Sequence, residues 1–87
     1  FIITRKGECF AWGNNEYRTL GIDSNHNKII DIPTKITFTS GEIYDVVGVE
    51  DELSLNNITF LVAKYGIYYC GVWINKNANV TPAPTFV

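Results

Sequence analysis

Residues that could perform nucleophilic chemistry are few in this chain. Histidine occurs once, at His26, and cysteine occurs twice, at Cys9 and Cys70. Both cysteines lie inside apolar stretches, where a thiol usually packs as a small hydrophobic group, and the spacing does not bring His26 beside either of them. No known catalytic motif occurs in the sequence. We therefore expect a protein without enzymatic activity or cofactor, with two reduced cysteines and an intracellular location.

Oxygen ligands at alternate positions suggest a calcium loop in one stretch. The candidate ligands there are Asp23, Asn25, Asn27 and Asp31. The pattern fails where calcium loops are strictest, because Lys28 stands at the position of the sharp-turn glycine and Thr34 at that of the bidentate glutamate. An asparagine-rich surface loop without a metal is the better interpretation.

A compact acidic cluster is formed by Glu50, Asp51 and Glu52, and it precedes Leu53 and Leu55. Negative charge beside apolar side chains suits a basic partner surface through electrostatic steering. We expect residues 50–57 to form a loop with at most one helical turn. Since loops carry function more often than strands do, the three acidic residues are candidate contacts for a protein partner.

Composition limits the remaining classes of protein. The chain has 87 residues, 46% hydrophobic and 18% charged, with a net charge of −2. The seven lysines and arginines are dispersed, which disfavours direct nucleic-acid binding, and no apolar run approaches the length that spans a bilayer. The sequence lacks methionine, so we expect a piece of a longer protein. Two sequons, at Asn57 and Asn79, leave open a secreted, glycosylated β domain.

Short apolar runs separated by turn residues predict an all-β fold, because no apolar period of 3.6 residues is sustained. Residues 42–49 are apolar on both faces and are expected to be covered on both. Residues 14–31 are expected to form a long loop, and residues 75–87 a tail that is first polar, then punctuated by proline and β-prone only at residues 85–87. Residues 1–4 and 8–13 are expected to form one hairpin and residues 58–63 and 67–71 a second, and residues 35–38 and 42–49 are expected as two further strands separated by a turn at 39–41.

The first hairpin recurs later in the chain. A shift of 58 positions lays Ile2-Ile3 on Phe60-Leu61, Cys9-Phe10 on Ile67-Tyr68, and Gly13 on Gly71. Pro33 and Pro84 each begin a second recurring pattern, Pro-x-x-apolar. A period above fifty residues that carries several short strands is typical of the blades of a β-propeller.

Residues 3–15, which contain Trp12-Gly13-Asn14-Asn15, are followed by Leu20-Gly21. This stretch resembles the repeat of the regulator of chromosome condensation family, whose hallmark is a strand ending in Trp-Gly-x-Asn and then Gly-Gln-Leu-Gly. Arg18-Thr19 replace the Gly-Gln, and Cys70 replaces the tryptophan of the second unit. The resemblance implies a first repeat over residues 1–57, with the acidic stretch as an insertion, and the start of a second over residues 58–87.

The resemblance implies a fragment of a β-propeller built from antiparallel sheets. Trp12 is expected to be buried between blades, Leu20 to anchor a loop, and the glycines to allow close approach or unusual φ. These structural residues are Gly7, Trp12, Gly13, Leu20, Gly21, Gly48, Gly66 and Gly71. The aromatic residues Tyr65, Tyr68, Tyr69 and Trp73 are expected to pack in the core.

Family membership would imply protein binding as the function. Relatives act as exchange factors for small GTPases, as chromatin-bound scaffolds and as recognition parts of ubiquitin ligases. A small GTPase or the remaining blades of the same propeller are therefore the expected partners. The alternative is a purely structural segment that braces a larger assembly, since repeat arrays usually need about three units for stability.

Overall fold

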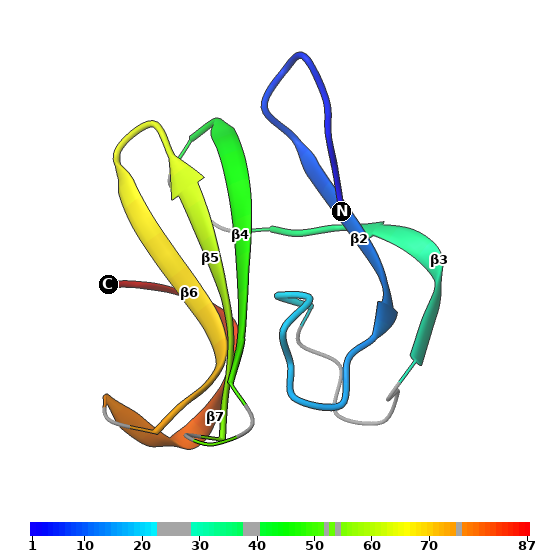
Figure 1. Ribbon diagram of the computed structural model, residues 1–87. Coiled ribbons are helices and arrows are strands. Elements are labelled where there is room, and N and C mark those ends of the chain that lie inside the picture. Colours follow the sequence, from blue (N-terminus) through cyan, green and yellow to red (C-terminus); the bar gives the residue numbers. More distant parts are fainter. Residues whose placement is uncertain (23–28, 38–40, 52, 54, 75) are drawn as a thin grey trace.

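The computed structural model contains seven strands in two antiparallel sheets (Figure 1). It describes residues 1–22, 29–37, 41–51, 53, 55–74 and 76–87, without the side chains of residues 77–79. The three-stranded sheet has the order β1-β2-β3 and the four-stranded sheet the order β4-β5-β6-β7. The strands are β1 (Ile2–Ile3), β2 (Cys9–Asn14), β3 (Ile29–Lys35), β4 (Ile43–Asp51), β5 (Asn56–Ala63), β6 (Gly66–Trp73) and β7 (Asn77–Phe86). The all-β fold of antiparallel sheets is confirmed.

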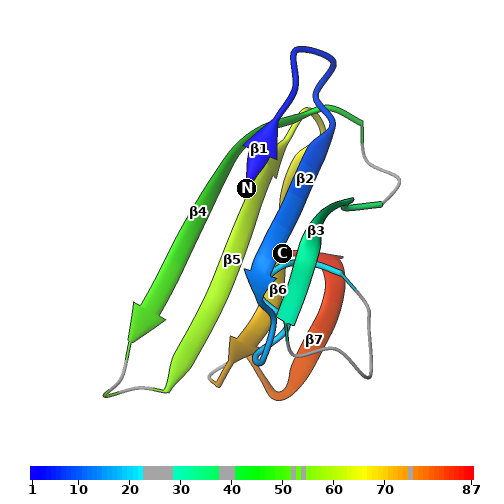
Figure 2. The ribbon, with the colours of Figure 1, turned by 90° about the vertical axis from the view of Figure 1, so that its right-hand side faces the viewer.

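The two sheets lie face to face as separate layers (Figure 2). Their buried core joins both layers and consists of Cys9, Ala11, Leu20, Ile30, Ile36, Ile43 and Leu61. Ile3, Val46 and Tyr68 pack against its margin. Each sheet has one apolar face to bury, so packing the two faces together removes both from water.

The two hairpins are equivalent, as the repeat predicted, but their turns differ in length. Residues 4–8 lie between the paired residues Ile3 and Cys9, whereas only residues 63–66 lie between the equivalent pair Val62 and Ile67. A shift of 58 residues therefore superimposes β2 on β6, whereas a shift of 59 residues is needed to superimpose β1 on β5. Thr4 then corresponds to Ala63, and Ile3 to Val62 rather than to Leu61.

Gly13 and Gly71 support the equivalence of β2 and β6. Their φ angles are +110° and +105°, and each lies where the register of its strand shifts. Such φ angles are strained for residues with a side chain. At Gly71 an added Cβ would also collide with the backbone oxygen of Asn57. Only glycine fits this bend.

Equivalent residues point in the same direction in both sheets. Cys9 and Ala11 face the four-stranded sheet and are fully buried. Their counterparts, Ile67 and Tyr69, alternate with the core-facing Tyr68 and so lie on the far face of that sheet. Ile67 is 46% exposed. We call the face of the three-stranded sheet that carries Cys9 and Ala11, and the equivalent face of the four-stranded sheet that carries Ile67 and Tyr69, the forward face, and the opposite face of each sheet the rear face. The forward face of the first sheet packs on the rear face of the second, as in stacked propeller blades.

Trp12 lies on the rear face of the three-stranded sheet and is 39% exposed. Trp12 is therefore not fully buried within this chain, and its expected burial between neighbouring blades stays a prediction. Its counterpart in β6, Cys70, is fully buried, and the loop after β2 packs against it through Thr19 and Gly21. Among the described residues, no further layer covers Trp12 in the same way.

Three boundary predictions were also wrong. Residues 35–38 were expected as a strand, but β3 spans Ile29–Lys35 and shortens the expected loop. Pro33 is tolerated there because β3 is an edge strand, where a missing N–H costs no ladder bond. The tail contains the ten-residue strand β7. The two ends of the expected loop 50–57 are strand, because Glu50 pairs with Asn57 and Asp51 with Asn56.

The expected coverage of residues 42–49 on both faces was wrong as well. β4 is an edge strand, and Tyr44 and Val47 are 57% and 45% exposed. An alternating apolar pattern predicts the strand, but it does not show which neighbours cover its faces.

Gly71→Ala should destabilise the fold by about 1 to 3 kcal/mol, because alanine must adopt a strained φ and its Cβ meets backbone. Gly48→Ala is the matched control, since a Cβ at Gly48 meets nothing within 4 Å, and we expect a change between zero and about 1 kcal/mol of stabilisation. Urea denaturation followed by tryptophan fluorescence measures both. Equal losses would refute the structural role of Gly71.

Leu61→Ala should cost about 2 to 5 kcal/mol of unfolding free energy, because Leu61 is fully buried between the sheets. Trp12→Ala should cost only about 1 kcal/mol, since Trp12 is 39% exposed. The same urea titrations, followed by far-ultraviolet circular dichroism, compare the two. A loss at Trp12 as large as that at Leu61 would mean that a further layer covers Trp12.

Candidate protein-interaction surface

The loop that follows β2 is held by a buried asparagine. Asn15 is fully buried, and its Nδ2 donates a hydrogen bond to the backbone oxygen of Ile22 at 3.1 Å. Its Oδ1 accepts a hydrogen bond from the amide of Leu20 at 3.2 Å. These bonds close the loop on itself and carry Tyr17 on its outer side, 48% exposed. Asn15 is the asparagine of the Trp-Gly-x-Asn pattern, which was a signal for this role.

The same loop packs on the four-stranded sheet. Leu20 is 6% exposed, and a Cβ at Gly21 (φ +73°) would lie 3.5 Å from the sulfur of Cys70. The Cys70 thiol donates a weak hydrogen bond to the backbone oxygen of Thr19 at 3.6 Å. Burial raises the pKa of Cys70 to about 12, and burial also raises the pKa of Cys9. Both free thiols are therefore poor nucleophiles that fill the core.

The acidic cluster lies where β4 turns into β5. Glu50 and Asp51 are the last residues of β4, and Glu50 is exposed. The third predicted contact, Glu52, lies outside the described residues. Leu53 is 98% exposed and Leu55 67% exposed. Leu55 has a φ of +59°, which is unusual for leucine and marks a tight turn.

Charged and apolar groups therefore gather at one end of the molecule. A hollow of about 220 Å³ separates the β4–β5 turn from the loop after β2, and it is lined by Tyr17, Glu50, Asp51, Leu55 and Asn57. The β4–β5 turn, the β6–β7 turn and the loop after β2 lie at the same end (Figure 1). We call Tyr17, Glu50, Asp51, Leu53 and Leu55 the hairpin-end surface.

The aromatic residues expected in the core are divided between different environments. Tyr69 is 4% exposed, and its ring centroid lies 5.3 Å from that of Trp73. Lys76 covers this pair from the far face, with its ammonium 5.5 Å from the Trp73 ring. Tyr65 is 70% exposed in the β5–β6 turn, so its expected burial is wrong. Tyr68 packs against the core.

The other predicted residues lie apart from the hairpin-end surface. Gly7 is in the β1–β2 turn, where a Cβ would lie 2.5 Å from that of Glu42, and Gly66 begins β6 against the ring of Phe86. Gly48 is in the exposed edge strand β4. His26 and three of the calcium-loop candidates, Asp23, Asn25 and Asn27, lie outside the described residues. Asp31 is exposed in β3.

Among the described side chains, no group of three or more histidine, cysteine, aspartate or glutamate residues could hold a metal ion. Within the same part of the chain, no helix is long and apolar enough to cross a membrane.

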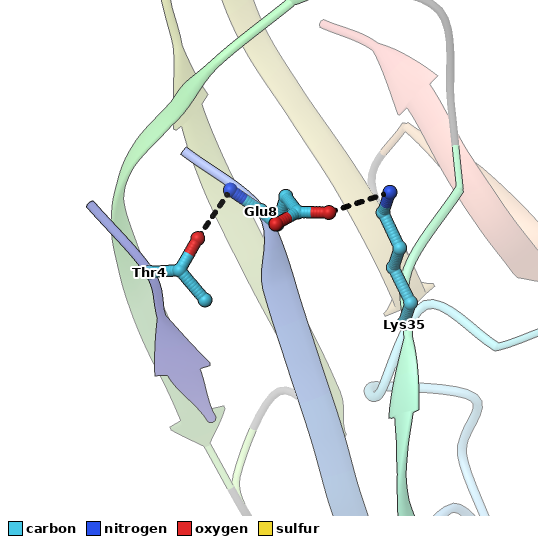
Figure 3. Close-up of polar contacts among 3 residues, drawn as sticks. All are labelled: Thr4, Glu8 and Lys35. Atoms are coloured by element: carbon cyan, nitrogen blue, oxygen red, sulfur yellow. Dashed lines mark hydrogen bonds and ion pairs between the residues drawn. The ribbon is translucent and has the colours of Figure 1, made fainter. Parts of the chain in front are cut away.

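An ion pair closes the other end of the three-stranded sheet. Lys35 Nζ lies 2.9 Å from Glu8 Oε2, and the Glu8 amide donates to Thr4 Oγ1 at 3.2 Å (Figure 3). The hydrogen bond and the positive charge of Lys35 hold the pKa of Glu8 below its usual 4.5. Glu8 thus ties β3 to the β1–β2 turn.

The Glu8 pair should stabilise the fold above pH 4.5 and lose this effect as the pH falls through the lowered pKa, because a depressed folded pKa favours the ionised native state. Lys35→Met should raise the pKa of Glu8 toward 4.5, and Lys76→Met, in the β6–β7 turn at the opposite end of the molecule, should leave it unchanged. Titration of the Glu8 carboxyl by NMR measures both. A Glu8 pKa that Lys35→Met leaves unmoved would contradict the pair.

Comparison with known proteins identifies the repeat. The family model of the regulator of chromosome condensation (RCC1) repeat matches residues 6–50, more than half of the chain. No curated protein and no solved structure gives a significant match. The matched region begins in the β1–β2 turn, contains β2 and β3, and ends in β4, so the repeat crosses from one sheet to the other. The chain belongs to the RCC1 repeat family and is a divergent segment of a β-propeller.

Proposed function

We propose that this segment binds a protein partner through the hairpin-end surface and performs no catalysis itself. The main support for this proposal is that Leu53 and Leu55 are exposed close in sequence to exposed Glu50, at the end of β4. Exposed leucines rimmed by charge are typical of interaction sites rather than of an inert surface. Family membership supports the same reading, because RCC1 repeats build propeller interaction modules.

A partner with basic and apolar side chains fits this surface best. Glu50 supplies negative charge, and the hollow beside Tyr17 and Leu55 offers space for an inserted side chain. Opposite charges steer association, and apolar anchors supply most of the affinity. A nucleotide-exchange role toward a small GTPase, or a recognition role in a ubiquitin ligase, would use the surface in this way. Nucleic acid and membrane are not part of the proposal.

A reducing, intracellular compartment is included in the proposal, because both cysteines are free and buried. The alternative of a glycosylated, secreted domain is less well supported. Asn57 is half-buried in β5 and lines the hollow beside Glu50, where a glycan would meet the loop after β2. The side chain of Asn79 lies outside the described residues.

Leu53→Asp is the most direct test, because it places charge on the surface without entering the core. Proteins that copurify with the propeller are quantified by mass spectrometry for wild type, Leu53→Asp and Tyr65→Ser. Tyr65 is a matched exposed control at the opposite end (Figure 1). We expect a set of partners that falls at least about tenfold with Leu53→Asp only, as for an interface anchor.

Recovery of the same partners with all three chains would refute the hairpin-end surface as the binding site. It would favour the alternative that the segment only braces its assembly. If a recovered partner is a small GTPase, nucleotide release from the purified GTPase distinguishes exchange activity from simple recognition.

A further inference from the structure

Cations that are dispersed along the sequence gather at one end of the folded chain. The β1–β2 turn carries Arg5 and Lys6, the β5–β6 turn carries Lys64, and all three residues are exposed. The two turns are equivalent in the repeat and lie at the same end, opposite the hairpin-end surface (Figure 1 and Figure 2). We call Arg5, Lys6 and Lys64 the turn-end surface. It is positively charged in a chain whose net charge is −2.

The segment that leads into β4 fixes the two turns relative to each other. The backbone oxygen of Glu42 accepts a hydrogen bond from the amide of Lys64 at 2.8 Å. The amide of the next residue, Ile43, donates to the oxygen of Gly7 at 3.0 Å. Each turn is thus bonded to one of two consecutive residues, so the cations of both turns are held around one short segment.

The turn-end surface is not neutralised by its own acidic neighbours. Glu8 is occupied by its ion pair with Lys35, and among the described residues no ion pair joins a carboxylate to a member of the turn-end surface. The hydrogen bond and charge of Lys35 lower the pKa of Glu8 most, and the charge of Lys6 lowers it further. An anion that approaches this end therefore meets cations whose charge is still available.

A hollow of about 380 Å³ lies beside Lys6, between the β1–β2 turn, the end of β3 and the start of β4. Lys6 and Lys35 both line it, and so do Glu8 and Glu42. Two ammonium groups can receive one inserted carboxylate there. The two carboxylates in the lining oppose a dense row of anions, so the hollow suits a single acidic side chain.

We propose that the turn-end surface binds an acidic segment of a protein partner, whose separated aspartate or glutamate side chains reach the two turns and the hollow. Opposite charges at fixed positions favour association and oppose partners of the wrong sign. Arg5 can hold a carboxylate through two parallel hydrogen bonds, whereas Lys6 and Lys64 act as point charges. This surface is separate from the hairpin-end surface, which attracts basic partners at the other end.

The spacing of charge favours an acidic peptide over a nucleic acid. A DNA duplex carries one negative charge about every 1.7 Å, and its binding depends on many phosphate contacts. Glu42 interrupts the cations here, because it is exposed and belongs to the segment that both turns contact. Alternate side chains of an extended peptide lie about 6 to 7 Å apart, so carboxylates at that spacing can reach the cations and avoid Glu42.

The test titrates the full 87-residue chain with a synthetic peptide that alternates glutamate and glycine, followed by the amide resonances in NMR. We expect saturable shifts at residues 4–8 and 64–66 and none at residues 50–57. Added salt should weaken binding, because it screens exposed charges. Absence of shifts, shifts confined to residues 50–57, or equal binding of a peptide with glutamine in place of glutamate would each overturn the proposal.

Charge reversal in the chain locates the site independently. Lys6→Glu and Lys64→Glu should each weaken binding at least about threefold, because each turns an attraction between exposed charges into a repulsion. Lys76→Glu makes the same change of net charge in the β6–β7 turn at the opposite end (Figure 1) and should leave the affinity unchanged. Equal weakening by Lys76→Glu would mean that net charge alone attracts the peptide, and it would overturn the proposal.

Two further measurements separate this surface from the other candidates. Leu53→Asp, which tests the hairpin-end surface, should leave binding of the glutamate peptide unchanged, so that either surface can fail without the other. A single-stranded oligothymidylate of equal length should bind more weakly than the glutamate peptide at the same salt concentration. Tighter binding of the oligonucleotide would assign the turn-end surface to nucleic acid and overturn the proposal.

Discussion

Burial of apolar surface between the two sheets is the interaction on which the rest of the structure depends. Leu61 from one sheet and Cys9 and Ala11 from the other are fully buried there. A chain of this size buries only about 60% of its extended surface, so little stability is available from elsewhere. The β1–β2 turn, which accepts a hydrogen bond from the first residue of β4, and the loop held by Asn15 fix the position of one sheet on the other, whereas the ion pair of Glu8 fixes β3 within its own sheet. The hairpin-end surface is then presented at the common end of these elements.

The same constraint explains why equivalent residues differ in exposure. Cys9 and Ile67 occupy matching positions in β2 and β6, yet one is buried and the other is 46% exposed. Trp12 and Cys70 show the opposite contrast. Both differences follow from the order of the layers. The three-stranded sheet turns its forward face to the four-stranded sheet, so its forward residues are buried, whereas its rear face and the forward face of the four-stranded sheet lie on the outside. The exposed fraction of a strand residue in this segment therefore depends on which layer and which face it occupies, and less on whether its side chain is polar.

The sequence repeat and the structural layer are out of phase. The matched repeat, residues 6–50, ends within β4, whereas the sheets divide between β3 and β4. A repeat that contributes strands to two sheets links neighbouring layers covalently, so that neither sheet is an independent folding unit. The predicted boundary between residues 57 and 58 falls inside β5, and it remains a prediction about the sequence repeat alone.

Local sequence by itself determined the strands, the tight turns and the family. Alternating apolar residues bounded by glycine predict β2, β5 and β6, and the Trp-Gly-x-Asn pattern identifies the repeat, because these features depend on near neighbours. Tertiary structure decided what the patterns leave open. Trp12 is half open because no layer covers it here, β3 begins earlier because Ile30 is buried in the core, and Glu50 and Asp51 extend β4 because asparagines pair opposite them. Burial and long-range pairing depend on which segments meet in space, and spacing along the chain does not contain that information.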